Sequence, residues 1–182
     1  MLFLRRFLRD EPLDAAAAAI YGRFASQARE PGFYIDLEVP DTVDGRFEMV
    51  ALHAFLVFRR LKGQGEEVDR LAQATYDVMF KEMDLALREL GAADIGVGKR
   101  IKFMTEALNG RIQSYEQGLS VPDPAPLSEA LQRNLYGTVT VTEAALAGMG
   151  AYLRAAAADL ASQDLAALVA AEISFPPPAQ FI

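Results

Sequence analysis

Apolar side chains recur at helical spacing along almost the whole chain, and this pattern limits the folds that the chain can adopt. Near the start, Leu13, Ala17 and Ile20 follow one another in steps of four and three residues, which places them on one face of a helix. No segment alternates between apolar and polar residues for long enough to build a sheet. The pattern therefore predicts an all-α fold, a single-domain irregular bundle of about six to seven helices.

Turn-forming residues divide the pattern into segments. Pro12 suits the first turn of a helix, Asp44 is a candidate N-cap, and Gly63 and Gly91 are candidate C-terminal residues. The Pro-rich join at 121–126 cannot continue a helix and predicts a corner within one domain. We expect helices over 13–29, 44–62, 66–90, 94–117, 127–135, 143–162 and 164–173, and an extended piece over 33–39.

The two ends differ from the helical domain predicted over 13–174. Residues 1–12 form a basic amphipathic segment, which could lie on an anionic membrane or pack its apolar side onto the bundle. Its candidate membrane-contact residues are Phe3, Leu4, Phe7 and Leu8 on the apolar side and Arg5, Arg6 and Arg9 on the basic side. The Pro-rich apolar tail at 175–182 could dock a partner, but packing back onto its own domain is favoured.

Composition excludes several classes of protein. The formal net charge is −7 and no fully basic face is apparent, which argues against specific binding of nucleic acid. The absence of cysteine excludes disulfides, thiol catalysis and cysteine-bound metals. The longest apolar runs, such as 49–58, are about half of the ~20 residues that a bilayer needs. The N-terminus resembles neither a secretory signal nor a transit peptide, so we expect a soluble protein that is not imported.

The chain offers few residues for catalysis. His53 is the only histidine, so paired-histidine metal motifs cannot be built. It lies within an apolar helix, where a satisfied buried histidine is favoured, with an axial haem ligand as the alternative. Asp84 and Arg88 are four residues apart on a helix, so an exposed ion pair is favoured over a metal site. We expect neither an enzyme nor a bound cofactor.

A basic cluster lies near the start of one predicted helix. Lys99, Arg100 and Lys102 run against the preference of helix N-termini for acids, which arises because the unpaired amides there carry partial positive charge. The nearby glycines are two residues apart and no hydroxyl follows the lysine, so the pattern of a phosphate loop is missing. Two interpretations stay open: the cations pair with neighbouring acids, or they face an anionic partner.

Four stretches, taken in order, resemble the ubiquinol–cytochrome c chaperone family. They are VDGRFEMVALHAFLVFRRL at 43–61, MFKEMDLALRELG at 79–91, DIGVGKRIKFM at 94–104 and NGR at 109–111. Each stretch alone is weak, whereas the ordered set is fairly specific. The resemblance covers about residues 13–115 and continues more loosely to 152.

The resemblance implies a non-enzymatic assembly chaperone. Mitochondrial members of this family assist synthesis and assembly of cytochrome b, the membrane subunit of the bc1 complex, together with a small partner protein and near the ribosome. We therefore expect binding of cytochrome b or an early bc1 assembly intermediate, with the ribosome and a small protein as further candidate partners. Since no transit peptide is found, the chain is expected to be a bacterial member, cytoplasmic with peripheral contact at the inner membrane. Residues assigned to partner binding as a hypothesis are Arg46, His53, Arg60, Arg88, Asp94, Lys99, Arg100, Lys102 and Arg111.

The alternative function is a helical carrier of an apolar small molecule. Bundles readily enclose apolar pockets, and a Met- and Phe-rich stripe could line one for a quinone, a lipid or haem, although such stripes are more often plain core. The residues that would line it are Met79, Phe80, Met83, Phe103 and Met104.

Overall fold

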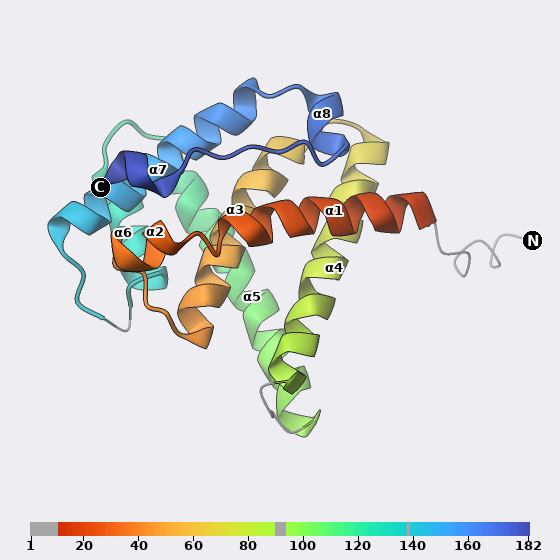
Figure 1. Ribbon diagram of the computed structural model, residues 1–182, viewed down its shortest axis with the longest axis horizontal. Coiled ribbons are helices and arrows are strands. Elements are labelled where there is room, and N and C mark those ends of the chain that lie inside the picture. Colours follow the sequence, from red (N-terminus) through yellow and green to blue (C-terminus); the bar gives the residue numbers. More distant parts are fainter. Residues whose placement is uncertain (1–10, 90–93, 138) are drawn as a thin grey trace, which may run out of the picture.

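The computed structural model of the chain describes residues 11–89, 94–137 and 139–182; over 94–105, and at 87 and 107, it describes the backbone alone. These residues form eight α-helices and a C-terminal 3-10 helix, with no strand among them (Figure 1). The predicted all-α bundle is confirmed. The helices are α1 Glu11–Gln27, α2 Pro31–Ile35, α3 Val43–Leu61, α4 Glu66–Glu89, α5 Asp94–Leu119, α6 Ala125–Asn134, α7 Glu143–Ser162 and α8 Leu165–Val169, followed by the 3-10 helix η2 Pro178–Phe181.

The start of α3 is set by a threonine cap. The side chain of Thr42 accepts a hydrogen bond from the amide of Gly45, so the prediction of Asp44 as the N-cap was wrong. Both residue types cap helices well, and the sequence alone does not decide between neighbours. Gly45 is needed at this position because a Cβ there would lie 2.0 Å from the carbonyl oxygen of Pro40.

The segment predicted as extended over 33–39 begins inside a short helix, α2. Pro31 stands at its start, where the fixed φ of proline favours a first helical turn. Phe33 is fully buried and holds the helix against the core, and the chain turns again at Glu38, which has a positive φ of 55°. The last helix, α8, is likewise shorter than predicted, because Ala171 at φ 61° turns the chain into its C-terminal tail.

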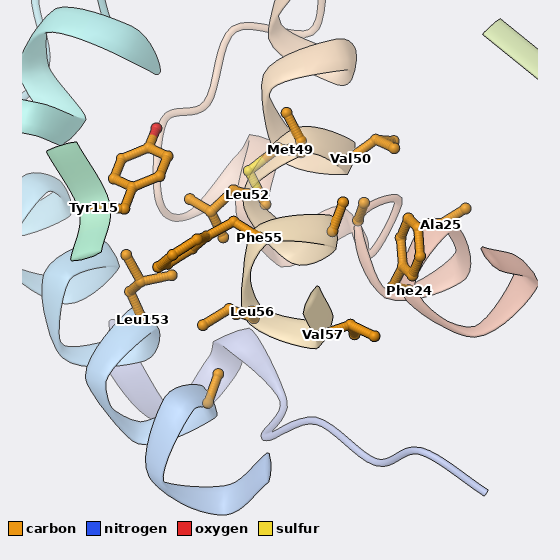
Figure 2. Packing of buried hydrophobic residues seen from close by; sticks show 14 of the residues in the cluster. Phe24, Ala25, Met49, Val50, Leu52, Phe55, Leu56, Val57, Tyr115 and Leu153 are labelled. Carbon is orange, nitrogen blue, oxygen red and sulfur yellow. The ribbon is translucent and has the colours of Figure 1, made fainter. Parts of the chain in front are cut away.

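Helix α3 is the centre of the bundle. Residues 48–57 are all buried, as expected for a helical stretch that is apolar on nearly every side. Figure 2 shows Phe24 of α1 on one side of α3, near Val57, and Tyr115 of α5 and Leu153 of α7 on the other side. Helices α4 and α5 form a long hairpin whose connected ends project away from α7 and α8 (Figure 1). None of the helices in the described ranges is long and apolar enough to cross a bilayer.

The C-terminal tail packs onto its own domain, as the sequence favoured. The side-chain amide of Gln163 donates to the carbonyl oxygen of Ser174 at 2.9 Å and accepts from its amide at 3.2 Å. Pro178 is buried, close to Gly32 of α2, and the ring of Phe181 packs edge-on against Tyr152 with centroids 5.6 Å apart. The tail therefore closes the side of the bundle formed by α2 and α7.

Candidate functional site

Two of the cations predicted to bind a partner are exposed and already paired with nearby acids. Arg46 holds Asp41 at 2.6 Å, and this hydrogen bond lowers the pKa of the Asp41 carboxyl. Arg88 holds Asp84 at 2.6 Å one turn away on α4, so the predicted ion pair is confirmed. Exposed pairs of this kind contribute little to stability, and both guanidinium groups stay accessible to another molecule.

Arg60 makes its contacts inside the domain. Its guanidinium donates to the carbonyl oxygens of Leu160 at 2.9 Å and Gln163 at 3.0 Å. These carbonyls lie at the C-terminal end of α7, where helix carbonyls have no partner within the helix and a cation is favourable. Arg60 thus ties the end of α3 to the end of α7.

Arg111 forms a largely buried ion pair with Glu48. Its guanidinium donates to both carboxylate oxygens of Glu48, and the two side chains are 17% and 9% exposed. Burial raises the pKa of Glu48, and the bonds from Arg111 oppose that rise. The guanidinium also lies 5.6 Å from the ring centre of Phe47. The pair links α5 to the first half of α3 and leaves little of Arg111 for a partner.

His53 is fully buried, so in this structure it has no surface with which to contact a partner. Its Nδ1 lies 2.8 Å from the carbonyl oxygen of Met49, which can only accept, so Nδ1 carries the proton. Nε2 then accepts from the hydroxyl of Tyr152 at 2.7 Å. The side-chain amide of Gln27 donates to that hydroxyl oxygen at 3.4 Å and to the carbonyl oxygen of Pro176 at 3.3 Å. The interpretation of His53 as a satisfied core histidine is confirmed.

The remaining predicted residues lie where side chains are not described. Asp94, Lys99, Arg100 and Lys102 belong to the first half of α5, whose backbone is helical. The candidate membrane-contact residues Phe3, Leu4, Arg5, Arg6, Phe7, Leu8 and Arg9 lie outside the described residues.

The stripe considered for a small-molecule pocket is part of the core where it is described. Met79, Phe80 and Met83 are 0%, 9% and 9% exposed and belong to the main hydrophobic cluster. Phe103 and Met104 lie in the stretch of α5 without described side chains. In the described part of the chain, no three His, Asp or Glu side chains gather closely enough to hold a metal ion.

A groove between α1, α3 and α4 was missed by sequence reasoning. We call it the α1–α3–α4 groove; it has a volume of about 430 Å³. Most lining residues of α3 and α4 stand at i, i+3, i+4 and i+7. Tyr21 of α1 and Arg29, in the turn after α1, line the remaining side. Among the predicted partner-binding residues whose side chains are described, Arg46 alone lines this groove, and Met83 of the predicted Met- and Phe-rich stripe lines it as well. The lining residues of the two walls are Val43, Arg46, Phe47 and Val50 on α3, and Glu82, Met83, Leu85, Ala86 and Glu89 on α4.

A second open groove, of about 760 Å³, lies between α3, α4 and α5. Phe55, Phe58 and Ile112 supply apolar surface, and an ion pair of 2.9 Å between Arg59 and Glu116 crosses its rim. Neither groove brings together an acid, a base and a nucleophile in a form that suggests catalysis. Both have the mixture of apolar walls and polar rim that is typical of surfaces for binding other molecules.

Comparison with known proteins gives one consistent family. The family model described as ubiquinol–cytochrome C chaperone matches residues 36–175. "Protein CBP3, mitochondrial" of Saccharomyces cerevisiae is 30% identical over 108 residues, which are 58% of this chain and 32% of the yeast protein. "Ubiquinol-cytochrome-c reductase complex assembly factor 1" of Xenopus laevis is 24% identical over 103 residues, 57% of this chain and 51% of that protein. The aligned part thus spans about a third to a half of these relatives.

The fold also matches a solved structure along nearly its whole length. The crystal structure of the Cbp3 homolog from Brucella abortus superposes with a TM-score of 0.82 at 35% sequence identity, covering 97% of this chain and 98% of that one. The family model accounts for well over half of the chain, from the turn before α3 to the start of the tail. The sequence resemblance is therefore confirmed, and the chain belongs to the ubiquinol–cytochrome c chaperone family.

Proposed function

We propose that this protein is an assembly chaperone for the bc1 complex and acts by binding rather than by catalysis. The observation that carries the proposal is the family match over residues 36–175, together with a whole-length likeness to a Cbp3 homolog. The aligned relative from Xenopus laevis bears the name of an assembly factor for ubiquinol–cytochrome c reductase. The open grooves on α3 and α4 support a binding role, because they offer apolar walls at an accessible surface.

The client that we propose is cytochrome b, or an early assembly intermediate that contains it. A membrane protein under assembly presents apolar helices and charged connecting segments before its partners cover them. A stoichiometric chaperone needs surfaces that shield both kinds of segment. The apolar groove walls and the exposed cations Arg46 and Arg88 offer such surfaces without a nucleotide-driven cycle.

The direct test is deletion of the gene in the source organism, followed by reduced-minus-oxidised spectra of its membranes. Selective loss of the b-type signal and of bc1 activity, restored by the gene in trans, is the expected result. An unchanged b-type signal and normal bc1 activity would refute the assembly role. Loss of bc1 activity with a normal b-type signal would keep that role and refute cytochrome b as the client.

We propose that the basic cluster of α5, which consists of Lys99, Arg100 and Lys102, contacts negatively charged segments of the client. We expect Lys99→Glu combined with Lys102→Glu to reduce co-purification of cytochrome b with the tagged protein by about tenfold, because two attractions become repulsions. The matched control is Lys81→Glu with Arg133→Glu, which changes the net charge equally at two exposed positions outside both grooves. Equal recovery of cytochrome b with both double variants would contradict the assignment.

A further inference from the structure

The two walls of the α1–α3–α4 groove have similar residue spacing. On α3 the lining residues stand at i, i+3, i+4 and i+7; on α4 four residues have the same spacing and Met83 lies beside them at i+1, so each wall is one face of a helix. Such faces are the surfaces with which helices pack against one another. Here the faces of α3 and α4 border an open groove of about 430 Å³ instead of meeting. The geometry suits side chains from one face of a further helix.

The middle of the groove is apolar and accessible. Val43 on the α3 wall and Leu85 on the α4 wall are each 45% exposed, whereas Phe47 and Val50 are more buried between them. Large apolar side chains that stay this exposed on opposite walls of a groove lose unfavourable contact with water when another apolar surface covers them. A ligand of this groove should therefore present an apolar stripe.

The unpaired charge of the groove is negative. Glu82 and Glu89 flank Leu85 on α4, about 10 Å apart at 1.5 Å per residue. Both carboxylates are exposed, and neither has an ion-pair or hydrogen-bond partner within the described part of the chain. Arg46 is ion-paired with Asp41 at 2.6 Å, whereas Arg29 donates to the neutral carbonyl oxygen of Ala25 at 3.3 Å and keeps its charge. Two carboxylates thus face one cation without an acidic partner among the described residues, and the net charge is negative. The free carboxylates favour a ligand that carries Lys or Arg.

We propose that the α1–α3–α4 groove binds an amphipathic helix of a partner protein. The helix places an apolar stripe between Val43 and Leu85 and two basic residues, about two turns apart, against Glu82 and Glu89. In such binding of a helix in a groove, burial of apolar surface supplies the affinity. The ion pairs with Glu82 and Glu89, at the two ends of the apolar stripe, fix the position of the helix along the groove. The proposal goes beyond a role in bc1 assembly, because it specifies the chemistry of the bound segment for any partner.

The first experiment replaces Leu85 by a photo-crosslinking amino acid in the full chain, within cells of the source organism. Mass spectrometry of the adduct then identifies the crosslinked segment. The expected result is one partner segment with apolar residues at i, i+3, i+4 and i+7 and with Lys or Arg seven residues apart. An adduct to residues 1–9 of this chain, to a second copy, to a lipid or other small molecule, or to an acidic segment would overturn the proposal, and so would the absence of any adduct.

The second experiment measures binding of a synthetic peptide with the captured sequence to purified protein. Glu82→Lys combined with Glu89→Lys should weaken binding roughly tenfold, and Leu85→Asp should weaken it more than tenfold. The matched control is Glu129→Lys with Glu172→Lys, two exposed acids outside the groove, which should leave the affinity unchanged. Thermal unfolding of each variant verifies the fold. The same affinity for all four proteins would refute the proposed groove, whatever the gene deletion shows about bc1.

Discussion

His53 occupies the point at which α3, α7 and the C-terminal tail meet. The rings of Phe33 and Phe175 pack edge-on against it, with centroids 5.5 and 5.3 Å away. The carbonyl oxygen of Met49 places a proton on Nδ1, and burial favours the neutral ring, whose Nε2 accepts from Tyr152. Charging this ring would place an unpaired cation in the core, so the position couples stability to pH.

Acidification is expected to destabilise the fold through His53. Burial lowers its pKa from 6.5 to about 4. The contribution of the neutral ring to the free energy of unfolding is therefore complete above pH 6.5 and is lost as the pH falls toward 4. The loss approaches about 1.4 kcal/mol per pH unit and about 3 kcal/mol in total. His53→Gln cannot titrate, so between pH 6.5 and 5 its free energy of unfolding in urea should fall less steeply than that of the wild type. Parallel pH profiles would contradict this assignment.

Removal of one partner of the Glu48–Arg111 pair is expected to cost more than removal of both. Arg111→Met leaves a buried carboxylate without its cation, for a loss of about 2–4 kcal/mol in the free energy of unfolding. Glu48→Met combined with Arg111→Met leaves no such charge and should lose less. A double-mutant cycle in urea measures the coupling. Additive losses would show that the two side chains do not act as a pair.

The contrast between these ion pairs explains which residues could be placed from sequence. Asp84 and Arg88 share one helix, so spacing alone predicts their contact. Arg111 meets an acid 63 residues away, and that meeting depends on how α5 packs against α3. The family pattern therefore identifies a basic residue, but it does not show whether that residue contacts a partner or forms an ion pair within the domain.

At the scale of elements, length decided which helices could be predicted. The 20-residue α7 was predicted with its observed bounds, because several turns of apolar periodicity identify a helix. The five-residue α2 spans less than two turns, too few for a period of 3.6 to be distinguished from an extended strand. Pro31 favours the first turn of this helix, and the tertiary contact of Phe33 with the core holds the helix in place.

Two glycines of α7 offer a matched test of the seating of the tail. An Ala side chain at 148 would place its Cβ 2.2 Å from the carbonyl oxygen of Phe181, whereas at 150 the nearest atom lies 3.9 Å away. Gly150→Ala should therefore raise stability by about 0.5–1 kcal/mol through helix propensity. Gly148→Ala should displace η2 and lower the melting temperature. Equal melting temperatures of the two variants would contradict a tightly seated tail.

At the scale of the whole molecule, the grooves arise from the way in which long helices diverge. Helix α1 packs against both α3 and α4, and the groove opens where α1 ends and the two other helices separate. The sequence predicted each of these helices but contains no local signal for the angle between them. The apolar residues Val43, Phe47 and Val50 recur at helical spacing on α3 and were a usable signal, since they mark an apolar face before the partner of that face is known.

This architecture predicts a gradient of local stability. Amides in the centre of α3, which is buried on all sides over 48–57, should exchange hydrogen only through global unfolding. Amides near the end of α4, at 84–89, lie on the projecting hairpin, where the side chains at 85, 86, 88 and 89 are exposed, and should exchange much faster. Hydrogen exchange followed by mass spectrometry measures both. Uniform protection along α4 would show that the hairpin is as firmly held as the body.

Because the chain has a single histidine, the NMR signal of His53 can report on binding without any added label. Only one imidazole contributes to the NMR spectrum, and the ring of Phe175 beside it shifts its resonances strongly. A client that lifts the tail would move this signal by removing that ring current. A helix that settles between α3 and α4 with the tail in place would leave the contact intact. One unlabelled resonance can thus distinguish two ways of holding a client while the complex forms.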